Sequence, residues 1–562
     1  MHLTNSNSSI IGVSLSLIPE QPRLERAQTA VSLGRDIRVQ DNIEPTFFHL
    51  PEEVHAKIIC YLEFRDITRI AKVCVYLRDL VKNNKALEIA WFRRFPSPRQ
   101  YQLKTIVMTK DSQQLRDWLK PFANRDTVES LIEQQNRTYF PALLLFTNSK
   151  LMSQCEKFKL EKKTKKSEHG FVNGAKFSPD SRYAVTCDLG AKVKIYGQKT
   201  GGSWKTKATF SHNEPVTSAT FSPNGRHIVT ASFDGEAKIC DLGDDGSWEV
   251  KTTITHDGHV KSVKFSADGG HLMIASSCGA VKIYGQKIGG SWEEKATIIH
   301  NHRVNSASLS SDGRQVLVVD EKNNATIYVQ EDDESWKVKG NFSHHHSLYS
   351  ASFSTDGRHL ATASGDRTAK ICDLQSNGSW KQIVEVVHYD EVYSARFSDN
   401  GRNLVTAGKD CRAKIYGRKA SGLWVKEATI KHKDAVGLAY FSADGRHVVT
   451  ASRDKTAQIY GQETPGSWVH KATITHKGRL LSATFSADGC YVLTIADDDK
   501  RAKIYGISAD GSWVKKATIR HKRQITFATL SADGRHVLSV DESGKVTIMS
   551  LSDGSSSLSS TN

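Results

Sequence analysis

The stretch FSADGRHVVTASRDKTAQIYGQETPGSWVHKATITHKG, residues Phe441–Gly478, carries the pattern that most of the chain repeats. Its landmark is an aromatic residue or Leu followed by Ser, any residue, and Asp or Asn. The landmark falls at Phe177, Phe221, Phe265, Leu309, Phe353, Phe397, Phe441, Phe485 and Leu530. Successive positions differ by 44 residues (221 − 177) seven times and by 45 (530 − 485) once. Insertions would disturb this spacing, so the connecting loops are expected to be nearly uniform.

Each repeat contains four candidate strands. Val436–Ser442 alternates apolar and polar residues before the turn Ala-Asp-Gly, which is typical of a tight hairpin. His447–Ser452 is β-branched and largely apolar, as expected for a strand covered on both faces. Thr456–Tyr460 follows a second turn, and Gly466–Ile474 alternates again as an outer strand. A period in this range with several short strands predicts a mainly β fold, a β-propeller whose units need their neighbours to bury their apolar faces.

Nine landmark turns predict nine blades. The last unit, Ile525–Met549, has no outer strand after it, whereas the alternating, basic segment Phe158–Lys163 precedes the first unit. We therefore expect this early strand to pair with Lys545–Met549 and close the ring. Propellers usually have about four to eight blades, so eight blades with a dangling terminal unit are the alternative.

The repeats resemble WD repeats. The resemblance lies in the loop His (His432), the Phe-Ser-x-Asp-Gly turn and the Asp before the third strand (Asp454). It implies a hydrogen-bond network in each blade between that His, that Asp and a hydroxyl on the second strand. The implied pairs are His212 with Asp234, His388 with Asp410, His432 with Asp454, and His476 with Asp499. The first, third and last units have Gly190, Cys278 and Ser543 at the Asp position, so their blades are expected to be less rigid.

A helical segment precedes the repeats. Between Phe47 and Phe95, apolar residues recur at helical spacing in two short helices with a break near Glu63–Arg65, and a third helical piece carries Leu87 and Trp91. These helices are too few for a thick core, so their apolar faces need a partner or the next domain to cover them.

This segment resembles an F-box. The matching residues are Leu50-Pro51-x-Glu53-Val54, Ile58-Ile59-x-Tyr61-Leu62, Asp66-Ile67, Val73-Cys74, and Leu87 with Trp91. One departure is Leu77, where the family usually has Trp. The resemblance implies docking onto a Skp-type adaptor and through it onto a cullin. The implied adaptor contacts are Leu50, Pro51, Ile58, Ile59 and Leu62. Alternatively, the helices only cap the propeller.

Composition divides the chain into five segments. We expect a disordered N-terminus (1–45), an F-box (46–95), a helical linker that sets the distance to the propeller (96–156), the WD-repeat propeller (157–551) and a disordered tail (552–562). The nine cysteines include no Cys-x-x-Cys pair, which favours a reducing compartment and no structural zinc. No signal peptide or membrane-spanning run is expected, so a cytoplasmic location is predicted, with a nuclear one open.

No catalytic chemistry is expected from the sequence. His300, His302 and the His344–His346 triplet lie in the repeated loop without a ligand set, and no glycine-rich phosphate loop is present. We therefore predict no enzyme activity, no metal and no cofactor. The resemblances predict a substrate receptor of a Skp–cullin–F-box ubiquitin ligase. The alternative is a WD-repeat interaction scaffold outside such a ligase, which includes a microbial protein that exploits host ubiquitination. Nucleic-acid binding would draw only on the charge of +16 and is not expected.

The sequence also predicts where a substrate binds. In WD repeats the loops before the first strand and between the second and third strands lie on one face, which commonly holds ligands. In this chain those loops are acidic in the second unit and basic in the later units. The candidate substrate-binding residues are Arg367, Arg412, Arg453, Lys455, Arg479, Arg501 and Arg523. Because guanidinium groups match carboxylate and phosphate geometry, we expect an acidic or phosphorylated protein segment there. The alternative is solubilising charge on exposed turns.

Overall fold

The structure is a computed structural model that describes residues 52–553 except 124, 168–170, 200–201 and 288–289. The predicted disorder of residues 1–45 therefore lies outside the described residues, as does the predicted disorder of the tail from residue 554 onward. The chain forms two compact units, Met1–Trp91 and Phe92–Asn562. Each unit is described by itself below.

Unit 1 is helical. Its helices are α2 (Glu52–Tyr61), α3 (Phe64–Ile70), α4 (Val75–Asn83) and the start of α5 (Ala86–Arg93). Their shared core includes Ile59, Ile67, Leu77 and Leu80. The stretch that the periodicity assigns to one second helix is two, because the chain turns at residues 71–74 and Cys74 is extended (φ −152°). Apolar spacing alone did not detect this turn, since the residues on both sides face the same core.

Unit 2 contains nine four-stranded antiparallel sheets, and eight of them use strands that are consecutive in the sequence. Blade 1 has β2 (Val172–Phe177), β3 (Tyr183–Asp188), β4 (Lys192–Gln198) and β5 (Trp204–Ser211); blade 2 has β6 (Val216–Phe221), β7 (His227–Ser232), β8 (Glu236–Leu242) and β9 (Trp248–Thr255); blade 3 has β10 (Val260–Phe265), β11 (His271–Ser276), β12 (Ala280–Gln286) and β13 (Trp292–Ile299). Blade 4 has β14 (Val304–Leu309), β15 (Gln315–Asp320), β16 (Asn324–Gln330) and β17 (Trp336–Ser343); blade 5 has β18 (Leu348–Phe353), β19 (His359–Ser364), β20 (Thr368–Leu374) and β21 (Trp380–Val387); blade 6 has β22 (Val392–Phe397), β23 (Asn403–Gly408), β24 (Arg412–Arg418) and β25 (Trp424–Lys431). Blade 7 has β26 (Val436–Phe441), β27 (His447–Ser452), β28 (Thr456–Thr464) and β29 (Ser467–Thr475), and blade 8 has β30 (Leu480–Phe485), β31 (Tyr491–Ala496), β32 (Arg501–Ile507) and β33 (Trp513–Arg520).

The ninth blade closes the ring with strands from both ends of the unit. It consists of β34 (Ile525–Leu530), β35 (His536–Asp541), β36 (Lys545–Asp553) and β1 (Phe158–Ser167). Strand β1 pairs antiparallel with β36, with Phe158 opposite Asp553 and Lys162 opposite Met549. The nine-bladed propeller and its closure by this early strand are therefore confirmed, but the register is shifted, because Phe158–Lys162 pairs with Met549–Asp553 and Lys545–Ile548 pairs with Thr164–Ser167. The predicted tail begins two residues too early, because Ser552 and Asp553 belong to β36.

The core lies between neighbouring blades. One cluster joins Val405 and Ile415 of blade 6 to Val436 and Val448 of blade 7. The Trp that starts most outer strands packs beside the preceding blade, as Trp424 does against His359 with ring centroids 5.7 Å apart. Burial on both faces explains the continuous apolar character of the second strands.

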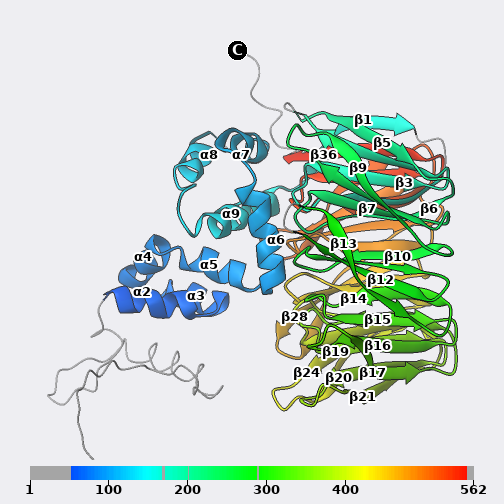
Figure 1. The fold of residues 1–562 in the computed structure, drawn as a ribbon. Helices are drawn as coiled ribbons and strands as arrows, with labels where there is room; N and C mark the ends of the chain where they lie inside the picture. Colours follow the sequence, from blue (N-terminus) through cyan, green and yellow to red (C-terminus); the bar gives the residue numbers. More distant parts are fainter. Residues whose placement is uncertain (1–51, 124, 168–170, 200–201, 288–289, 554–562) are drawn as a thin grey trace, which may run out of the picture. The chain divides into compact units, whose positions relative to one another are not determined.

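The linker residues fold onto the propeller instead of spanning a gap. They form α6 (Ser97–Met108), α7 (Ser112–Leu119), α8 (Arg125–Ile132) and α9 (Phe140–Gln154), which lie beside the blades in Figure 1. The buried guanidinium of Arg535 in blade 9 lies 4.9 Å from the ring centroid of Trp118 and 4.0 Å from that of Phe122. It also donates a 2.5 Å hydrogen bond to Asn148. The linker is therefore part of unit 2, and only its sequence position suggested a spacer.

Candidate adaptor- and substrate-binding surfaces

A hydrogen-bond network at one end of each blade positions the loops of the candidate substrate face. In blade 7, His432 Nδ1 lies 2.8 Å from Asp454 and Nε2 lies 2.8 Å from Thr450. Asp454 also accepts from the backbone N–H of Lys433 at 3.0 Å. The loop before the first strand and the turn between the second and third strands are thus tied together, which places them on the same face.

The four predicted His–Asp pairs are all present. The ring-to-carboxylate distances are 3.0 Å for His212–Asp234, 3.0 Å for His388–Asp410, 2.8 Å for His432–Asp454 and 2.9 Å for His476–Asp499. His344 and Asp366 make a fifth pair at 2.8 Å.

Three blades depart from this arrangement. In the last blade the expected loss of the Asp is compensated, because Asp541, two residues before Ser543, lies 3.3 Å from His521. In blade 4 an Asp at the same earlier position takes this role, since Asp320 lies 3.1 Å from His300. In blade 3 the expected loss is real: both ring nitrogens of His256 are buried and have no hydrogen-bond partner among the described residues. The loop His of the first unit lies outside the described residues.

Burial favours the neutral form of loop histidines such as His432 and His344 by lowering their pKa. Burial lowers the pKa of His432, and the hydrogen bond to Asp454 only partly opposes that effect. Burial lowers the pKa of the partnerless His256 to about 4. Burial would raise the pKa of Asp366, but hydrogen bonds from Thr368 and His344 outweigh it and bring the pKa to about 2. Blades 5 and 7 therefore each hold a neutral imidazole against a carboxylate anion.

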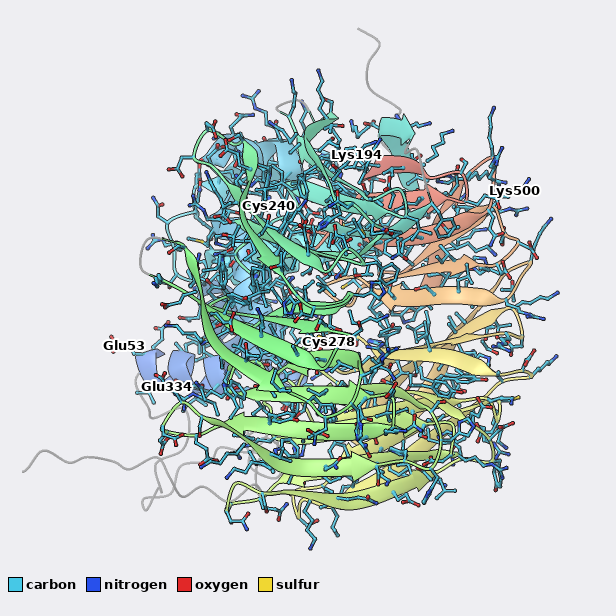
Figure 2. The ribbon with its side chains drawn as sticks, turned by 45° about the vertical axis from the view of Figure 1, so that its right-hand side comes forward. Glu53, Lys194, Cys240, Cys278, Glu334 and Lys500 are labelled. Atoms are coloured by element: carbon cyan, nitrogen blue, oxygen red, sulfur yellow. The ribbon has the colours of Figure 1, made fainter. Side chains whose placement is uncertain are left out.

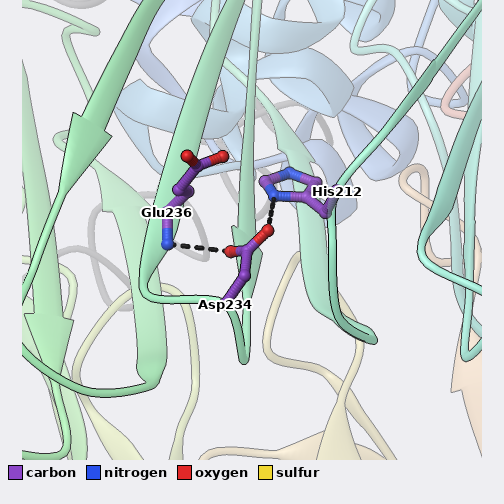
Figure 3. Close-up of side chains that lie close together, drawn as sticks. All are labelled: His212, Asp234 and Glu236. Atoms are coloured by element: carbon purple, nitrogen blue, oxygen red, sulfur yellow. Dashed lines mark hydrogen bonds and ion pairs between the residues drawn. The ribbon is translucent and has the colours of Figure 1, made fainter.

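One set of three side chains has the residue types of a metal site. His212, Asp234 and Glu236 lie together at the end of blade 2, as Figure 3 shows. His212 already uses both ring nitrogens, on Asp234 and on Thr230 at 2.8 Å, and Glu236 pairs with Lys238 at 3.3 Å. The His–Asp contact recurs in blades with a different residue at the Glu236 position, so these residues form a structural network.

Five of the seven candidate substrate-binding residues lie in the two loops that the network joins, and Arg412 and Arg501 are the first residues of β24 and β32, next to those loops. Arg367, Arg453, Lys455, Arg479 and Arg523 are exposed, whereas Arg412 and Arg501 are half-buried. Of these seven residues, only Arg501 has a carboxylate of the described part of the chain within ion-pair distance, at 3.8 Å from Asp499. Figure 2 shows Lys500, next to Arg501, projecting from the side of the ring away from the linker helices. The basic side of this face therefore offers unpaired guanidinium and ammonium groups to solvent.

Exposed tyrosines accompany these cations. Tyr389 is 76% exposed, and the Arg412 guanidinium lies 4.5 Å from its ring centroid. Tyr349 and Tyr393 form an edge-to-face pair nearby in blades 5 and 6, with centroids 5.7 Å apart. These tyrosines belong to different repeats, so only the folded ring brings them together. Tyr and Arg side chains that pack together are typical of binding hot spots.

Unit 1 carries exposed apolar side chains on and near α2. Ile58 is 36% exposed, Tyr61 82% and Val75 60%. Leu62 is half-buried, whereas Ile59 has no exposed surface and belongs to the core of the unit. Leu50 and Pro51 lie outside the described residues. Ile59 cannot contact a partner in this conformation, and Tyr61, which lies inside the matched motif, is the exposed residue that the sequence reading left out.

Comparison with protein families agrees with this division. The WD domain, G-beta repeat family matches residues 161–197, 204–241, 248–285, 336–373, 380–417 and 424–461, and the F-box-like family matches residues 47–88. The chain has the architecture of an F-box/WD-repeat protein. Families of both kinds generally act as adaptors or receptors and not as catalysts.

Whole-chain comparisons add little to this F-box/WD-repeat assignment. No curated protein matches the sequence. Among solved structures, Saccharomyces cerevisiae Sqt1 is similar at 12% identity and a TM-score of 0.48, covering 64% of this chain and 99% of that one. The C-terminal WD40 domain of Sif2 is similar at 14% identity and a TM-score of 0.48, covering 70% and 99%. Likeness at this level carries no information on function. No described helix is both long and apolar enough to cross a membrane.

Proposed function

We propose that this F-box/WD-repeat protein is the substrate-recognition subunit of a Skp–cullin–F-box ubiquitin ligase. The supporting observation is the pairing of two binding surfaces on one chain: an F-box-like unit with exposed apolar side chains, and a propeller face with unpaired cations. The protein itself performs no chemistry. It raises the local concentration of substrate lysines near a charged conjugating enzyme, in the cytoplasm, by holding substrate and adaptor at once.

The adaptor surface comprises Leu50, Pro51, Ile58 and Leu62, to which we add Tyr61. Removing apolar surface at the centre of such an interface is costly, because truncation of hot-spot residues loses about 2 kcal/mol or more. Ile58→Asp/Tyr61→Asp should therefore abolish co-purification with a recombinant Skp-type adaptor and cullin. The matched control is Leu423→Asp, which alters a propeller side chain that is 67% exposed. Unchanged co-purification of the double variant would contradict the adaptor role.

The substrate surface comprises Arg367, Arg412, Arg453, Lys455, Arg479, Arg501 and Arg523, and its ligand is an acidic or phosphorylated protein segment. Arg forks bind carboxylate and phosphate groups in a bidentate manner, and Tyr389 adds a stacking surface. Arg453→Glu/Arg479→Glu/Arg501→Glu should abolish substrate capture and leave adaptor binding intact. The control is Lys205→Glu/Lys337→Glu/Lys381→Glu, three charge reversals at exposed positions of outer strands. Capture that survives the first set at physiological salt, where charges are screened beyond about 8 Å, would exclude this face.

A non-ligase interaction scaffold is the second candidate. Capture of acidic protein segments without any adaptor binding by the wild-type chain would favour it. Ubiquitination of a captured protein only when adaptor, cullin and a conjugating enzyme are all present would favour the ligase receptor.

A further inference from the structure

The central channel of the propeller has an unusual charge composition. Its wall is built by the innermost strands β2, β6, β10, β14, β18, β22, β26, β30 and β34. These strands contain four basic residues, Lys176, Lys261, Lys264 and Arg396, and no Asp or Glu. Outer strands such as β13 and β25 mix both signs. The wall of the channel therefore carries a positive charge that its own strands do not neutralise.

Two adjoining cavities lie in this channel. Their volumes are about 640 Å³ and 580 Å³, and Lys176 lines both. Arg99 and Gln102 of α6 also line both cavities, so this helix lies across one mouth of the channel. Arg99 pairs with Asp399 at 3.0 Å, which neutralises the one carboxylate that lines either cavity. A volume in this range suits a small molecule, and the helix across the mouth disfavours a polypeptide threaded through the ring.

None of the four cations has an acidic partner within the described residues. The ammonium group of Lys176 lies 3.5 Å from the Thr220 hydroxyl, and Lys264 lines the first cavity. Arg396 lies 4.6 Å from the ring centroid of Tyr440, and its Nε is buried without a hydrogen-bond partner. The fourth cation, Lys261, lies 5.3 Å from the ring centroid of Phe233.

The positive groups influence one another across the channel. Solvent reaches Lys264, but the walls surround it, and this burial lowers its pKa, as do the positive charges of Lys176 and Arg396. Burial also lowers the pKa of Lys176. Low-dielectric walls focus such a field, and an anion bound between the cations would relieve their repulsion. Hydroxyl groups of Ser218 and Ser262 line the same cavity and can donate hydrogen bonds to phosphate oxygens.

We propose that the channel beneath α6 binds a small polyphosphorylated molecule, held by Lys176 and Lys264 of the first cavity, with Arg396 of β22 adding positive charge on the same wall. Several phosphate groups are required because the cations come from blades 1, 3 and 6 and so lie on different parts of the wall. Lysine is an effective point-charge partner for phosphate. The ligand occupies the channel and neutralises the positive charge of its wall. Its site is separate from the substrate site on the loop face.

The test titrates the full-length protein with inorganic tripolyphosphate and with orthophosphate by calorimetry. The titrations are made at about 50 and about 150 mM salt, because exposed charges are screened more strongly at the higher concentration. Wild type should bind tripolyphosphate at both salt concentrations, at least tenfold tighter than orthophosphate. Lys176→Gln/Lys264→Gln should weaken binding at least tenfold, whereas Lys205→Gln/Lys337→Gln should not. Equal weakening by both pairs, or binding that vanishes at the higher salt, would overturn the proposal in favour of nonspecific attraction. Equal affinity for orthophosphate would overturn the polyphosphate assignment.

Two further measurements keep the test independent of folding and of the substrate site. In the wild-type protein, tripolyphosphate should protect Lys176 and Lys264 from acetylation while leaving Lys205 reactive, as read by peptide mass spectrometry. Absence of this protection would refute the site even if the variants fail to fold. Arg453→Glu/Arg479→Glu/Arg501→Glu should retain tripolyphosphate binding, and its loss there would place the anion on the loop face.

Discussion

Replacing the same histidine in two blades should change stability in opposite directions. His432 in blade 7 and His256 in blade 3 are equivalent positions of the repeat, four periods apart (432 − 256 = 4 × 44). His432 is bonded to Asp454 and Thr450, whereas neither ring nitrogen of His256 has a partner among the described residues. A Leu at either position keeps a side chain of similar size, so the polar contacts are the main difference.

The expected magnitudes follow from the contacts. His432→Leu removes a hydrogen bond to a charged group, worth about 1.5–3 kcal/mol, and leaves the Thr450 hydroxyl unpaired. Asp454, whose side chain is 5% exposed, keeps its backbone donors but loses its imidazole. We expect a loss of about 3 kcal/mol for His432→Leu. His256→Leu removes two unsatisfied polar atoms and should stabilise the protein by about 1 kcal/mol, because each such atom costs about 1–3 kcal/mol.

Urea unfolding followed by far-UV circular dichroism measures both changes, and hydrogen exchange of β27 and β11 localises them. The variants can be compared by their urea midpoints only if the slope of the unfolding free energy against urea concentration is the same in each. Cys278→Asp supplies the missing carboxylate at the position equivalent to Asp454, so it should raise the urea midpoint, and His256→Leu should cancel that gain. Equal destabilisation by the two His→Leu variants would refute the reasoning, since it would show that shape and not the network sets the cost.

Three other changes test the fold and the substrate face. Because burial lowers the pKa of the loop histidines, such as His432, the unfolded chain takes up protons first, and the urea midpoint should fall as pH decreases below about 6.5; a midpoint that rises between pH 7.5 and 5.5 would contradict this sign. Lys455→Gly should stabilise the propeller by about 1 kcal/mol, because Lys455 has a left-handed backbone (φ 71°) that favours glycine, while weakening capture of an acidic substrate; destabilisation by this change would show that its side chain holds the turn. Arg535→Ala should increase hydrogen exchange in α7 and α9 and lower the free energy of unfolding by about 2 kcal/mol, because it removes the Asn148 bond and the contacts with Trp118 and Phe122; unchanged exchange would show that other contacts hold the linker.

The sequence by itself determined the features that are encoded locally. The turn at Phe441 and its eight equivalents predicted the number of blades, and alternation in Phe158–Lys163 identified the strand that closes the ring. The resemblance to WD repeats, carried by residues such as His432 and Asp454, implied which loops share a face. These features follow from sequence because hairpins, strand periodicity and turn residues act within one repeat of 44 residues (485 − 441).

Only the tertiary structure decided the features that join distant residues. Arg99 pairs with Asp399, which is 300 positions away in the sequence, so no local pattern predicts that α6 lies over the channel. Ile59 and Tyr61 are two residues apart in one amphipathic helix, yet packing against α3 and α4 buries the first and leaves the second 82% exposed. Lys176, Lys264 and Arg396 each look like an ordinary solvated charge within their own repeat. Ring closure brings their blades around one channel without an acidic residue in its wall, and it is this long-range assembly that creates the proposed anion site.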